Sequence, residues 1–446
     1  MNRWLAQKTY FTLQRLRGEP VRGALEDLRR TEFISREELL SLQAERQLAQ
    51  LRFVIDHVPW YQGAYAPFKE KIRKAQGHAE VAELMAELPA LEKDIVTSCF
   101  EKLKASGIPP SQTYPDKTSG SSGTPLMFPC DKKSWAYRHA LHFRQTGAFG
   151  VKVGDPYALF FGLHWNRRRR FETRLRDITF NRVRVSAFEI SPENVVRHLE
   201  SVRKHRPVYF LGYPSAIYDF CFMLKDRNLD LRDLGMKAVC LTAEPLHAYQ
   251  RELIMQVTGS PCINEYGSAE GGLSAFECPE GSLHLSSEVT SLQVREPGAT
   301  EGDALVTDMM LRAFPLIRYA IGDRVALKDG LCKCGRPHPM LQSVEGRSGI
   351  TIHLPNGRRV NANLPSYIFK PLASLNVIQR YRFVQSSEKS LELYLVVGNS
   401  FREEHRKIVE REMRTALGED LSIPIQIVDQ LPHLPNAKHR DYVRAY

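Results

Sequence analysis

The spacing of apolar positions predicts helices in the first hundred residues. Ser35 and Glu38 form the S-x-x-E pattern of a capping box, which predicts that a long helix begins directly after Ser35. Pro59 disfavours helical geometry in the residue before it, so this helix is expected to end at Val58. A second helix is expected over residues 92–104. The chain therefore begins with a helical region.

Short apolar runs alternate with amphipathic segments between about residue 155 and residue 266. The runs predict strands at 157–161, 208–211, 238–241 and 262–265, and the segments between them predict helices at 215–225 and 246–257. Strands that alternate with helices are typical of a largely parallel sheet. After Gly267 the sequence becomes rich in strands and turns.

The last hundred residues have a pattern of their own. Apolar strands are expected at 381–384 and 391–397, followed by a charged helix at 401–417 and a strand at 423–428. We therefore expect an α/β protein in two parts. Residues 1–346 would form a large N-terminal domain with parallel or mixed sheets and helices, and 347–446 a small, mobile α+β C-terminal domain.

The composition excludes few function classes. The 446 residues carry a formal net charge of +11, but the compact basic run at 167–170 is better explained as a solvated face than as a phosphate contact. No nucleic-acid-binding motif accompanies this run, and no apolar run is long enough to cross a bilayer. The first twenty residues lack the features of a signal peptide. We expect a cytoplasmic protein that binds no nucleic acid and has no integral membrane segment.

One short stretch, TSGSSGTP at 118–125, consists of Gly, Ser and Thr up to a closing proline. It lacks the Gly-Lys-Ser/Thr ending of a Walker loop, and it contains no Gly-x-Ser-x-Gly nucleophile elbow. Glycines would let the backbone approach an anion, and the N–H groups and hydroxyls would donate to phosphate oxygens. The residues alone leave a phosphate-binding loop and an ordinary loop equally open.

Five later segments follow this loop in an order that resembles one enzyme superfamily. They are AEPL at 243–246, NEYGSAE at 264–270, IRYAIGD at 317–323, EGR at 345–347 and LPNAKHR at 434–440. Together with TSGSSGTP, they resemble the ordered motifs of the adenylate-forming enzymes, which include acyl-CoA synthetases, luciferases and peptide-synthetase adenylation domains. One match would carry little weight, whereas six matches in order are specific.

The resemblance implies an ATP-dependent enzyme that joins a carboxylate to the α-phosphate of ATP with the help of Mg²⁺. It implies that Glu270 holds the magnesium ion, Asp323 accepts the ribose hydroxyls, Tyr266 stacks on the adenine, Arg347 lies at the hinge, and Lys438 stabilises the charge that develops during adenylation. The whole ATP- and AMP-binding set implied by the motifs is Thr118, Ser119, Gly120, Ser121, Ser122, Gly123, Thr124, Ala243, Glu244, Pro245, Glu265, Tyr266, Gly267, Ser268 and Asp323.

Within the superfamily, the chain is most similar to the phenylacetate–CoA ligase branch and its capsular-polysaccharide-biosynthesis relatives. This resemblance implies that coenzyme A accepts the acyl group. Transfer to an amine or hydroxyl, as in polysaccharide or secondary-metabolite biosynthesis, stays open as an alternative. Ala437 stands where the superfamily has Gly, and Ser348 stands where it has Asp after Gly-Arg. A degenerate nucleotide-binding protein without enzymatic activity is therefore a second alternative.

Three of the eight cysteines form a cluster with a histidine. CPEGSLH supplies Cys278 and His284, and CKCG supplies Cys332 and Cys334. Three Cys and one His form a standard structural zinc set, although paired cysteines can also be neighbours in a loop. Members of the phenylacetate–CoA ligase branch share this arrangement, and the resemblance favours structural Zn²⁺.

The acid substrate is not identified by the sequence. Residues between about 135 and 275 are expected to form its pocket, with Tyr213, Pro214, Ala243 and Gly267 as walls. The aromatic content of this region fits an aryl acid and fits an ordinary core equally well. The oligomeric state also stays open, with a homodimer as one alternative.

Overall fold

A computed structural model describes residues 2–117, 127–161, 170–187, 190–191, 193–244, 246 and 248–345. Further along, it describes 351–353, 359–361, 368–369, 372, 377–387, 390–398, 400–417, 423–429, 431 and 442–444. The chain divides into two compact units. The larger comprises Met1–Asp116 and Phe128–Gly346, and the smaller Lys117–Met127 and Arg347–Tyr446.

The larger unit begins with helices, as the sequence predicts. They are α1 (Arg3–Leu16), α2 (Val21–Thr31), α3 (Arg36–His57), α4 (Pro59–Ala64), α5 (Lys69–Lys74), α6 (Gly77–Glu87), α7 (Lys93–Ser98) and α8 (Phe100–Leu103). The capping box at the start of α3 is confirmed, since the Ser35 side chain accepts from the Glu38 N–H and the Glu38 carboxylate from the Ser35 N–H.

The single helix expected over 92–104 is wrong, because α7 and α8 are separate helices. Cys99 lies between them with ψ at 22°, outside helical geometry. The hydroxyls of Thr97 and Ser98 donate to backbone carbonyls four residues earlier. Such bonds compete with the backbone and weaken a helix, which accounts for the break.

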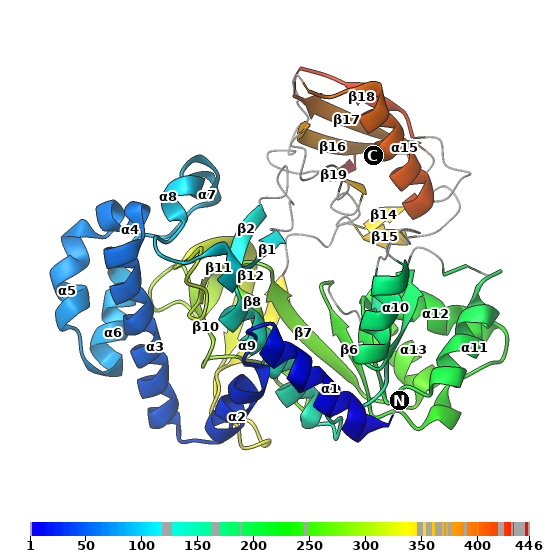
Figure 1. Ribbon diagram of the computed structural model, residues 1–446, viewed down its shortest axis with the longest axis horizontal. Helices are drawn as coiled ribbons and strands as arrows, with labels where there is room; N and C mark the ends of the chain where they lie inside the picture. Colours follow the sequence, from blue (N-terminus) through cyan, green and yellow to red (C-terminus); the bar gives the residue numbers. More distant parts are fainter. Residues whose placement is uncertain are drawn as a thin grey trace. The chain divides into compact units, whose positions relative to one another are not determined.

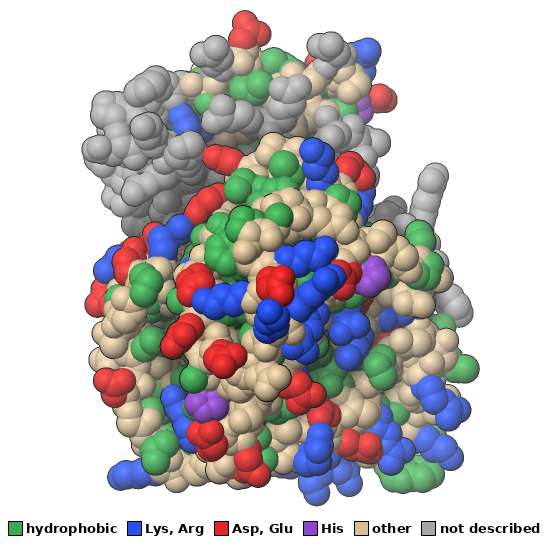
Figure 2. Space-filling view, turned by 90° about the vertical axis from the view of Figure 1, so that its left-hand side faces the viewer, with side chains coloured by type: hydrophobic (Ala, Val, Ile, Leu, Met, Phe, Trp, Pro, Cys, Tyr) green, Lys and Arg blue, Asp and Glu red, His purple; other side chains and the backbone are tan. Residues whose placement is uncertain are grey.

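Exposed charges cover the face on which the N-terminal helices lie. Figure 2 shows basic and acidic side chains interspersed there, with the basic ones gathering near the centre. Lys74 pairs with Glu70 at 2.8 Å and Arg73 with Asp56 at 3.3 Å, and all four are well exposed. Exposed pairs of this kind contribute little to stability, so this face has the character of a solvated helical surface.

An eleven-stranded sheet forms the centre of the larger unit, in the order β10-β11-β12-β13-β9-β8-β7-β6-β5-β3-β4. Its parallel part consists of β3 (Tyr157–Phe161), β4 (Arg182–Ser186), β5 (Tyr209–Gly212), β6 (Ala238–Thr242) and the start of β7 (Cys262–Ser268). The four strands predicted between 157 and 265 are thereby confirmed. Strand β4 was not predicted, because arginines at alternate positions interrupt its apolar run.

Helices lie between the parallel strands in the chain, namely α10 (Arg170–Thr179), α11 (Val195–His205), α12 (Pro214–Asp226) and α13 (Ala248–Thr258). Figure 1 shows these helices, mostly in green, gathered around the parallel strands. The antiparallel part contains β8 (Gly272–Glu277), β9 (Leu283–Leu285), β10 (Thr290–Val294), β11 (Glu301–Asp308), β12 (Tyr319–Lys328) and β13 (Met340–Glu345). A separate two-stranded sheet pairs β1 (Thr113–Lys117) with β2 (Met127–Asp131).

Helix α9 (Lys132–Gly147) packs against the N-terminal helices through a buried core. This core joins Tyr10 of α1 and Leu25 and Leu28 of α2 to Ala140 and Leu141 of α9. Since burial of apolar side chains is the main stabilising term of folding, this contact fixes α1 and α2 on α9. The cluster matters for function because α9 also borders a cavity of about 560 Å³.

The smaller unit contains a four-stranded sheet in the order β18-β17-β16-β19. Its strands are β16 (Ile378–Ser387), β17 (Ser390–Val397), β18 (Ile425–Ile427) and β19 (Tyr442–Arg444), and the helix α15 (Glu403–Leu417) joins β17 to β18. Strands β14 (Thr351–His353) and β15 (Arg359–Asn361) form a separate pair. The α+β pattern expected for the tail is confirmed. No helix in the described part of either unit has the length and hydropathy to span a membrane.

Candidate active site and metal centre

A cavity of about 560 Å³ lies within the larger unit, lined by residues of α1, α9 and the parallel strands. Tyr157, Leu159 and Phe161 all line it, because alternate residues of β3 point to the same face of the sheet. Thr242 and Ala243 at the end of β6, and Gly267 in β7, line it where these strands end. Ligands of open α/β sheets bind at the carboxyl ends of strands, and this part of the cavity lies there, which makes it a candidate site.

Helix α9 contributes one continuous face to the cavity. Its lining residues are Trp135, Arg138, His139, His142 and Phe143. They are spaced at i, i+3, i+4, i+7 and i+8, which places them along one side of an α-helix. The side that would be aliphatic in an ordinary core helix therefore carries an arginine and two histidines.

Two of these α9 side chains are held by neighbouring segments. The Arg138 guanidinium donates to Asp116 Oδ2 at 2.8 Å and to the Ala269 carbonyl at 2.8 Å. His142 Nδ1 lies 3.1 Å from Glu265 Oε1. These contacts join α9 to the 264–270 segment, so this segment is held directly against the cavity wall.

His139 differs from its neighbours on α9. Burial, followed by the nearby positive groups, lowers its pKa from the ordinary value to about 4, so the ring is neutral near pH 7. Its ring lies 5.3 Å from the Trp135 ring and 6.5 Å from the Tyr10 ring, centroid to centroid. No hydrogen bond joins its ring nitrogens to another residue of the described chain.

Tyr266 and Asp323 bring two distant sequence motifs together. The Tyr266 hydroxyl donates to Asp323 Oδ2 at 2.9 Å, although β7 and β12 are not neighbours in the sheet. Glu265 and Gly267, on either side of Tyr266, both line the cavity. The segment at 317–323 is thus joined by a hydrogen bond to Tyr266, whose two neighbours in the sequence line the cavity.

The segment at 243–244 is also fixed in place. Ala243 has φ at +69°, a left-handed conformation that is uncommon for a residue with a side chain. The Ser215 N–H, in the first turn of α12, donates to Glu244 Oε2 at 3.0 Å. Burial raises the pKa of Glu244 above its ordinary value, and the bonds from Ser215 oppose this rise.

The other predicted site residues lie in several places. Ser268 lines the cavity and Glu270 is buried just beyond β7. Tyr213 and Pro214 are not among the lining residues. The Tyr213 ring nevertheless packs edge-on against the ring of Phe161, which lines the cavity, with the ring centroids 4.6 Å apart. Several predicted residues lie outside the described residues, namely Thr118, Ser119, Gly120, Ser121, Ser122, Gly123, Thr124, Pro245, Arg347 and Lys438.

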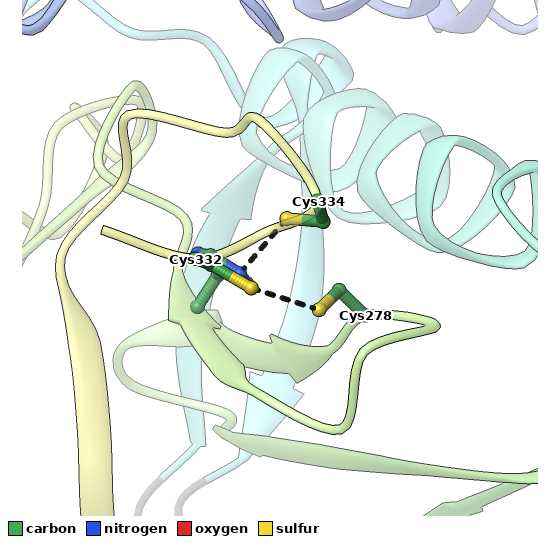
Figure 3. A group of neighbouring side chains, drawn as sticks. Cys278, Cys332 and Cys334 are labelled. Atoms are coloured by element: carbon green, nitrogen blue, oxygen red, sulfur yellow. Dashed lines mark hydrogen bonds between the residues drawn. The ribbon is translucent and has the colours of Figure 1, made fainter.

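Cys278, His284, Cys332 and Cys334 converge in the antiparallel part of the sheet. One ligand atom from each lies within 4.8 Å of the others. Figure 3 shows the thiols pointing toward one another, with Cys278 Sγ 3.7 Å from Cys332 Sγ and Cys334 Sγ 3.3 Å from His284 Nε2. The set brings together Cys278 directly after β8, His284 in β9, and the segment between β12 and β13.

The surroundings of this cluster suit a metal ion. His284 Nδ1 lies 3.2 Å from the His338 carbonyl, which can only accept, so the Nδ1–H donates and Nε2 keeps its lone pair toward the thiols. A backbone carbonyl that fixes the tautomer is common behind metal-bound histidines. Three sulfurs and one nitrogen are the donor set of structural zinc sites, and the residues present fit that ion.

The segment that carries Cys332 and Cys334 is anchored to the N-terminal helices. Arg336 is buried and its Nε donates to Glu32 at 3.0 Å, while the Arg36 guanidinium donates to the Pro337 carbonyl at 3.0 Å. His338 Nε2 lies 2.9 Å from Glu288 Oε2, and both side chains are fully buried. The cluster therefore lies at a junction of segments that are far apart in sequence.

Sequence reasoning missed most of the α9 and α1 contributions to the cavity. Apolar periodicity does not detect the inner face of α9, because polar side chains occupy three of its five lining positions. The spacing of Trp135, Arg138, His139, His142 and Phe143 could have revealed it, since a helical stripe that mixes aromatic, His and Arg side chains is unusual for a core.

Comparisons with known proteins show what this chain is similar to. Residues 352–444 match the family model of the CapK C-terminal domain. Protein CapK of Staphylococcus aureus is 25% identical over 273 residues, an alignment that spans 58% of this chain and 58% of that protein. Phenylacetate-coenzyme A ligase of Thermus thermophilus is 23% identical over 382 residues, or 81% of each chain.

The fold is also shared with a solved structure. The crystal structure of 2-hydroxyisobutyryl-CoA ligase in complex with 2-HIB-AMP and CoA in the thioesterification state aligns with a TM-score of 0.63. The sequences are 17% identical, and the alignment covers 93% of this chain and 91% of that chain. The expected α/β class and the resemblance to adenylate-forming ligases of the phenylacetate–CoA ligase branch are confirmed.

Proposed function

We propose that this chain, a relative of CapK and of phenylacetate-coenzyme A ligase, is an ATP-dependent ligase that activates a carboxylic acid as its adenylate and passes the acyl group to coenzyme A. The observation that carries the proposal is the Tyr266–Asp323 hydrogen bond of 2.9 Å beside the cavity. It joins two segments that resemble motifs of adenylate-forming enzymes and that lie on strands that are not neighbours in the sheet.

The nucleotide would be held by residues from separate segments. Asp323 would accept the ribose hydroxyls, and its bond to the Tyr266 hydroxyl would fix the orientation of the ring that lies against the adenine. Residues 118–124 would donate N–H and hydroxyl groups to the outer phosphates. Glu244, Ala243 and Pro245 would line the adenine side.

A carboxylate and a polyphosphate repel each other, so the enzyme must offset charge and align the reacting atoms. Glu270 would hold Mg²⁺, which neutralises phosphate charge when bound, and its burial beside β7 is compatible with that role. Lys438 would place a cation at the developing charge, and Arg347 would close over the nucleotide at the hinge.

The acid would occupy the cavity beneath α9. Its carboxylate would lie at the end lined by Ala243, Gly267 and Ser268, and its body would extend along β3. Tyr213 and Pro214 would support this wall from behind, through the contact of Tyr213 with Phe161.

A second candidate function differs only in the acceptor. Residues 352–444 match a CapK C-terminal domain. This resemblance to CapK is the reason to consider transfer of the acyl group to an amine or hydroxyl instead of coenzyme A. The adenylation step would be the same in both cases.

We also propose that Cys278, His284, Cys332 and Cys334 hold one structural Zn²⁺. Four protein ligands would leave no open position for catalysis, so the ion would stabilise the junction of β8, β9 and the 332–338 segment. A reducing compartment such as the cytoplasm would keep these thiols available to the metal.

The first test is release of pyrophosphate from ATP and Mg²⁺ in the presence of a panel of aryl and alkyl acids. Release with at least one acid is expected, and its absence with every acid would favour a nucleotide-binding protein without activity. Addition of coenzyme A, and separately of amino sugars, with mass analysis of the product, then distinguishes the two acceptors.

Replacement of the lysine tests the mechanism. Lys438→Ala should lower the rate of adenylation by about 10²–10³-fold, the usual effect of removing one group that stabilises transition-state charge. Lys407→Ala is the matched control, because Lys407 is an exposed lysine of α15 in the same unit. Equal rates for the Lys438 variant and the unmodified protein would contradict the assignment.

A further inference from the structure

The cavity is long in the direction of the strands. Tyr157, Leu159 and Phe161 all line it, and four steps along a strand span roughly 13 Å. Gly267 and Ser268 lie at the carboxyl end of the parallel strands, whereas Asp155 and Arg182 lie where β3 and β4 begin. An acid that fills this space is therefore extended, and its far end reaches the start of the strands.

Aromatic rings form much of the wall. Six of the lining residues are Tyr10, Trp135, Phe143, Tyr157, Phe180 and Tyr209. Tyr157 and Tyr209 stack on neighbouring strands with centroids 4.9 Å apart and an interplanar angle of 18°. Flat faces of this kind favour a flat, aromatic ligand over a branched aliphatic one.

Charged residues line the cavity in equal numbers of each sign. Arg138 is paired with Asp116, and Arg182 donates to Asp177 at 2.8 Å and to the Tyr157 hydroxyl at 3.2 Å. The two acids, Asp155 and Glu265, lie beside Arg3 and His142 respectively. Both arginines of the described wall already have a carboxylate partner, so a second carboxylate on the ligand would lose hydration without gaining a counter-ion.

Uncharged hydrogen-bonding groups remain available in the wall. His139 is neutral near pH 7 and makes no hydrogen bond to another described residue. The Tyr10 hydroxyl accepts from Gln14 at 3.3 Å, which leaves its own proton to donate. A ligand hydroxyl that bonds one of these groups gains a hydrogen bond that an apolar ligand cannot make.

We propose that the acid is an extended aromatic acid with an uncharged hydrogen-bonding substituent, such as a phenolic hydroxyl, and that His139 selects for this substituent. This inference rests on the proposed function, since it identifies the substrate class of the same site. His139 is a specificity-determining residue in this proposal, because either tautomer of its ring can bond a hydroxyl, and a site that bonds a hydroxyl discriminates against the analogue that lacks it.

Calorimetric titration tests the inference without turnover. The ligands are 4-hydroxycinnamate, 4-methylcinnamate and cinnamate, each measured with and without a nonhydrolysable ATP analogue. The unmodified protein should bind the hydroxyl acid roughly three- to tenfold more tightly than the methyl acid, as expected for one net hydrogen bond. His139→Phe should abolish this preference, and His139→Gln, which keeps a hydrogen-bonding group, should restore part of it.

A matched control separates selectivity from damage to the wall. Phe143→Leu alters the same face of α9 without removing a polar group, so the ratio of the two affinities should persist even if both weaken. Equal binding of hydroxyl and methyl acids by the unmodified protein would overturn the inference. An unchanged preference in His139→Phe, or failure of every hydroxylated acid to bind, would overturn it as well.

The outcomes also distinguish this inference from the proposed function. Selective binding without pyrophosphate release would support the substrate class and refute the ligase activity. Pyrophosphate release with no preference for the hydroxyl acid would support the ligase activity and refute the role of His139.

Discussion

Glu288 offers the strongest test of how the larger unit is held together. Its carboxylate and the guanidinium of Arg144 are both fully buried, and Arg144 donates to both carboxylate oxygens. Thr31 Oγ1 donates to Oε1 at 3.2 Å, and His338 Nε2 lies 2.9 Å from Oε2. One carboxylate therefore joins α2, α9, the β9–β10 turn and the segment that carries Cys332 and Cys334.

Glu288→Gln keeps the shape of the side chain and removes its charge. Arg144 would then be a buried cation without its counter-ion, and breaking a buried pair in this way costs about 3–5 kcal/mol of unfolding free energy. Arg144→Met should lower the free energy of unfolding by a similar amount, because it leaves the Glu288 carboxylate buried without its counter-ion. The double variant should be less destabilised than the sum of the two by about 1–3 kcal/mol, because it leaves neither charge unpaired.

The pH dependence gives the prediction a second, independent readout. Burial alone would raise the pKa of Glu288, but Arg144 and His338 hold it well below the ordinary value of 4.5. The carboxylate therefore contributes stability that is fully present above the unfolded-state pKa and is lost as the pH falls through the lower folded-state pKa. The difference in free energy of unfolding between the unmodified protein and Glu288→Gln should be largest near neutral pH and should decrease below pH 4.5.

Equilibrium unfolding in urea, followed by tryptophan fluorescence, measures these differences. All four tryptophans precede residue 346, so the signal reports the larger unit. A loss below about 1 kcal/mol at pH 7 would place the pair in the range of exposed ion pairs and refute the reasoning. If the difference in free energy of unfolding stayed constant down to acid pH, the charge of Glu288 would not be the cause of the destabilisation.

Two further predictions concern the metal centre and the motif contact. Protein purified without chelator should contain about one zinc per chain. Cys332→Ser should lose the zinc, whereas Cys99→Ser, which lies outside the cluster, should keep it. Absence of metal from the unmodified protein would contradict the site. Tyr266→Phe should raise the KM for ATP about fivefold through loss of one hydrogen bond to Asp323. Tyr394→Phe, which removes a comparable bond to Glu392 in the smaller unit, should not change it, and an equal effect of both would argue against a nucleotide site.

The sequence predicted the parallel strands well because their apolar runs are nearly unbroken. It placed Tyr266 and Asp323 in one site, and Cys278, His284, Cys332 and Cys334 in another, through motif order and residue type. The structure brings both groups together. Apolar periodicity is informative wherever both faces of a strand are buried, and β3 and β6 meet that condition.

The cavity wall could not be predicted in the same way. Periodicity identifies the face of a helix that contacts an apolar core, but the inner face of α9 contacts a hollow and carries Arg138, His139 and His142. The contribution of Tyr10 depends on tertiary packing over more than a hundred residues of sequence, which no local pattern encodes. The break at Cys99 was missed because it arises from side-chain bonds to the backbone.

Helix α1 has a consequence for how substrate preference could change between relatives. Ala6 and Tyr10 complete the cavity wall, yet α1 reaches it through an interface of side chains and not through the sheet. Because α1 contributes to the cavity wall only through side-chain contacts, the whole helix can be exchanged as a unit. Hybrid proteins that receive α1 from a relative would be expected to inherit part of its acid preference while the nucleotide chemistry stays intact.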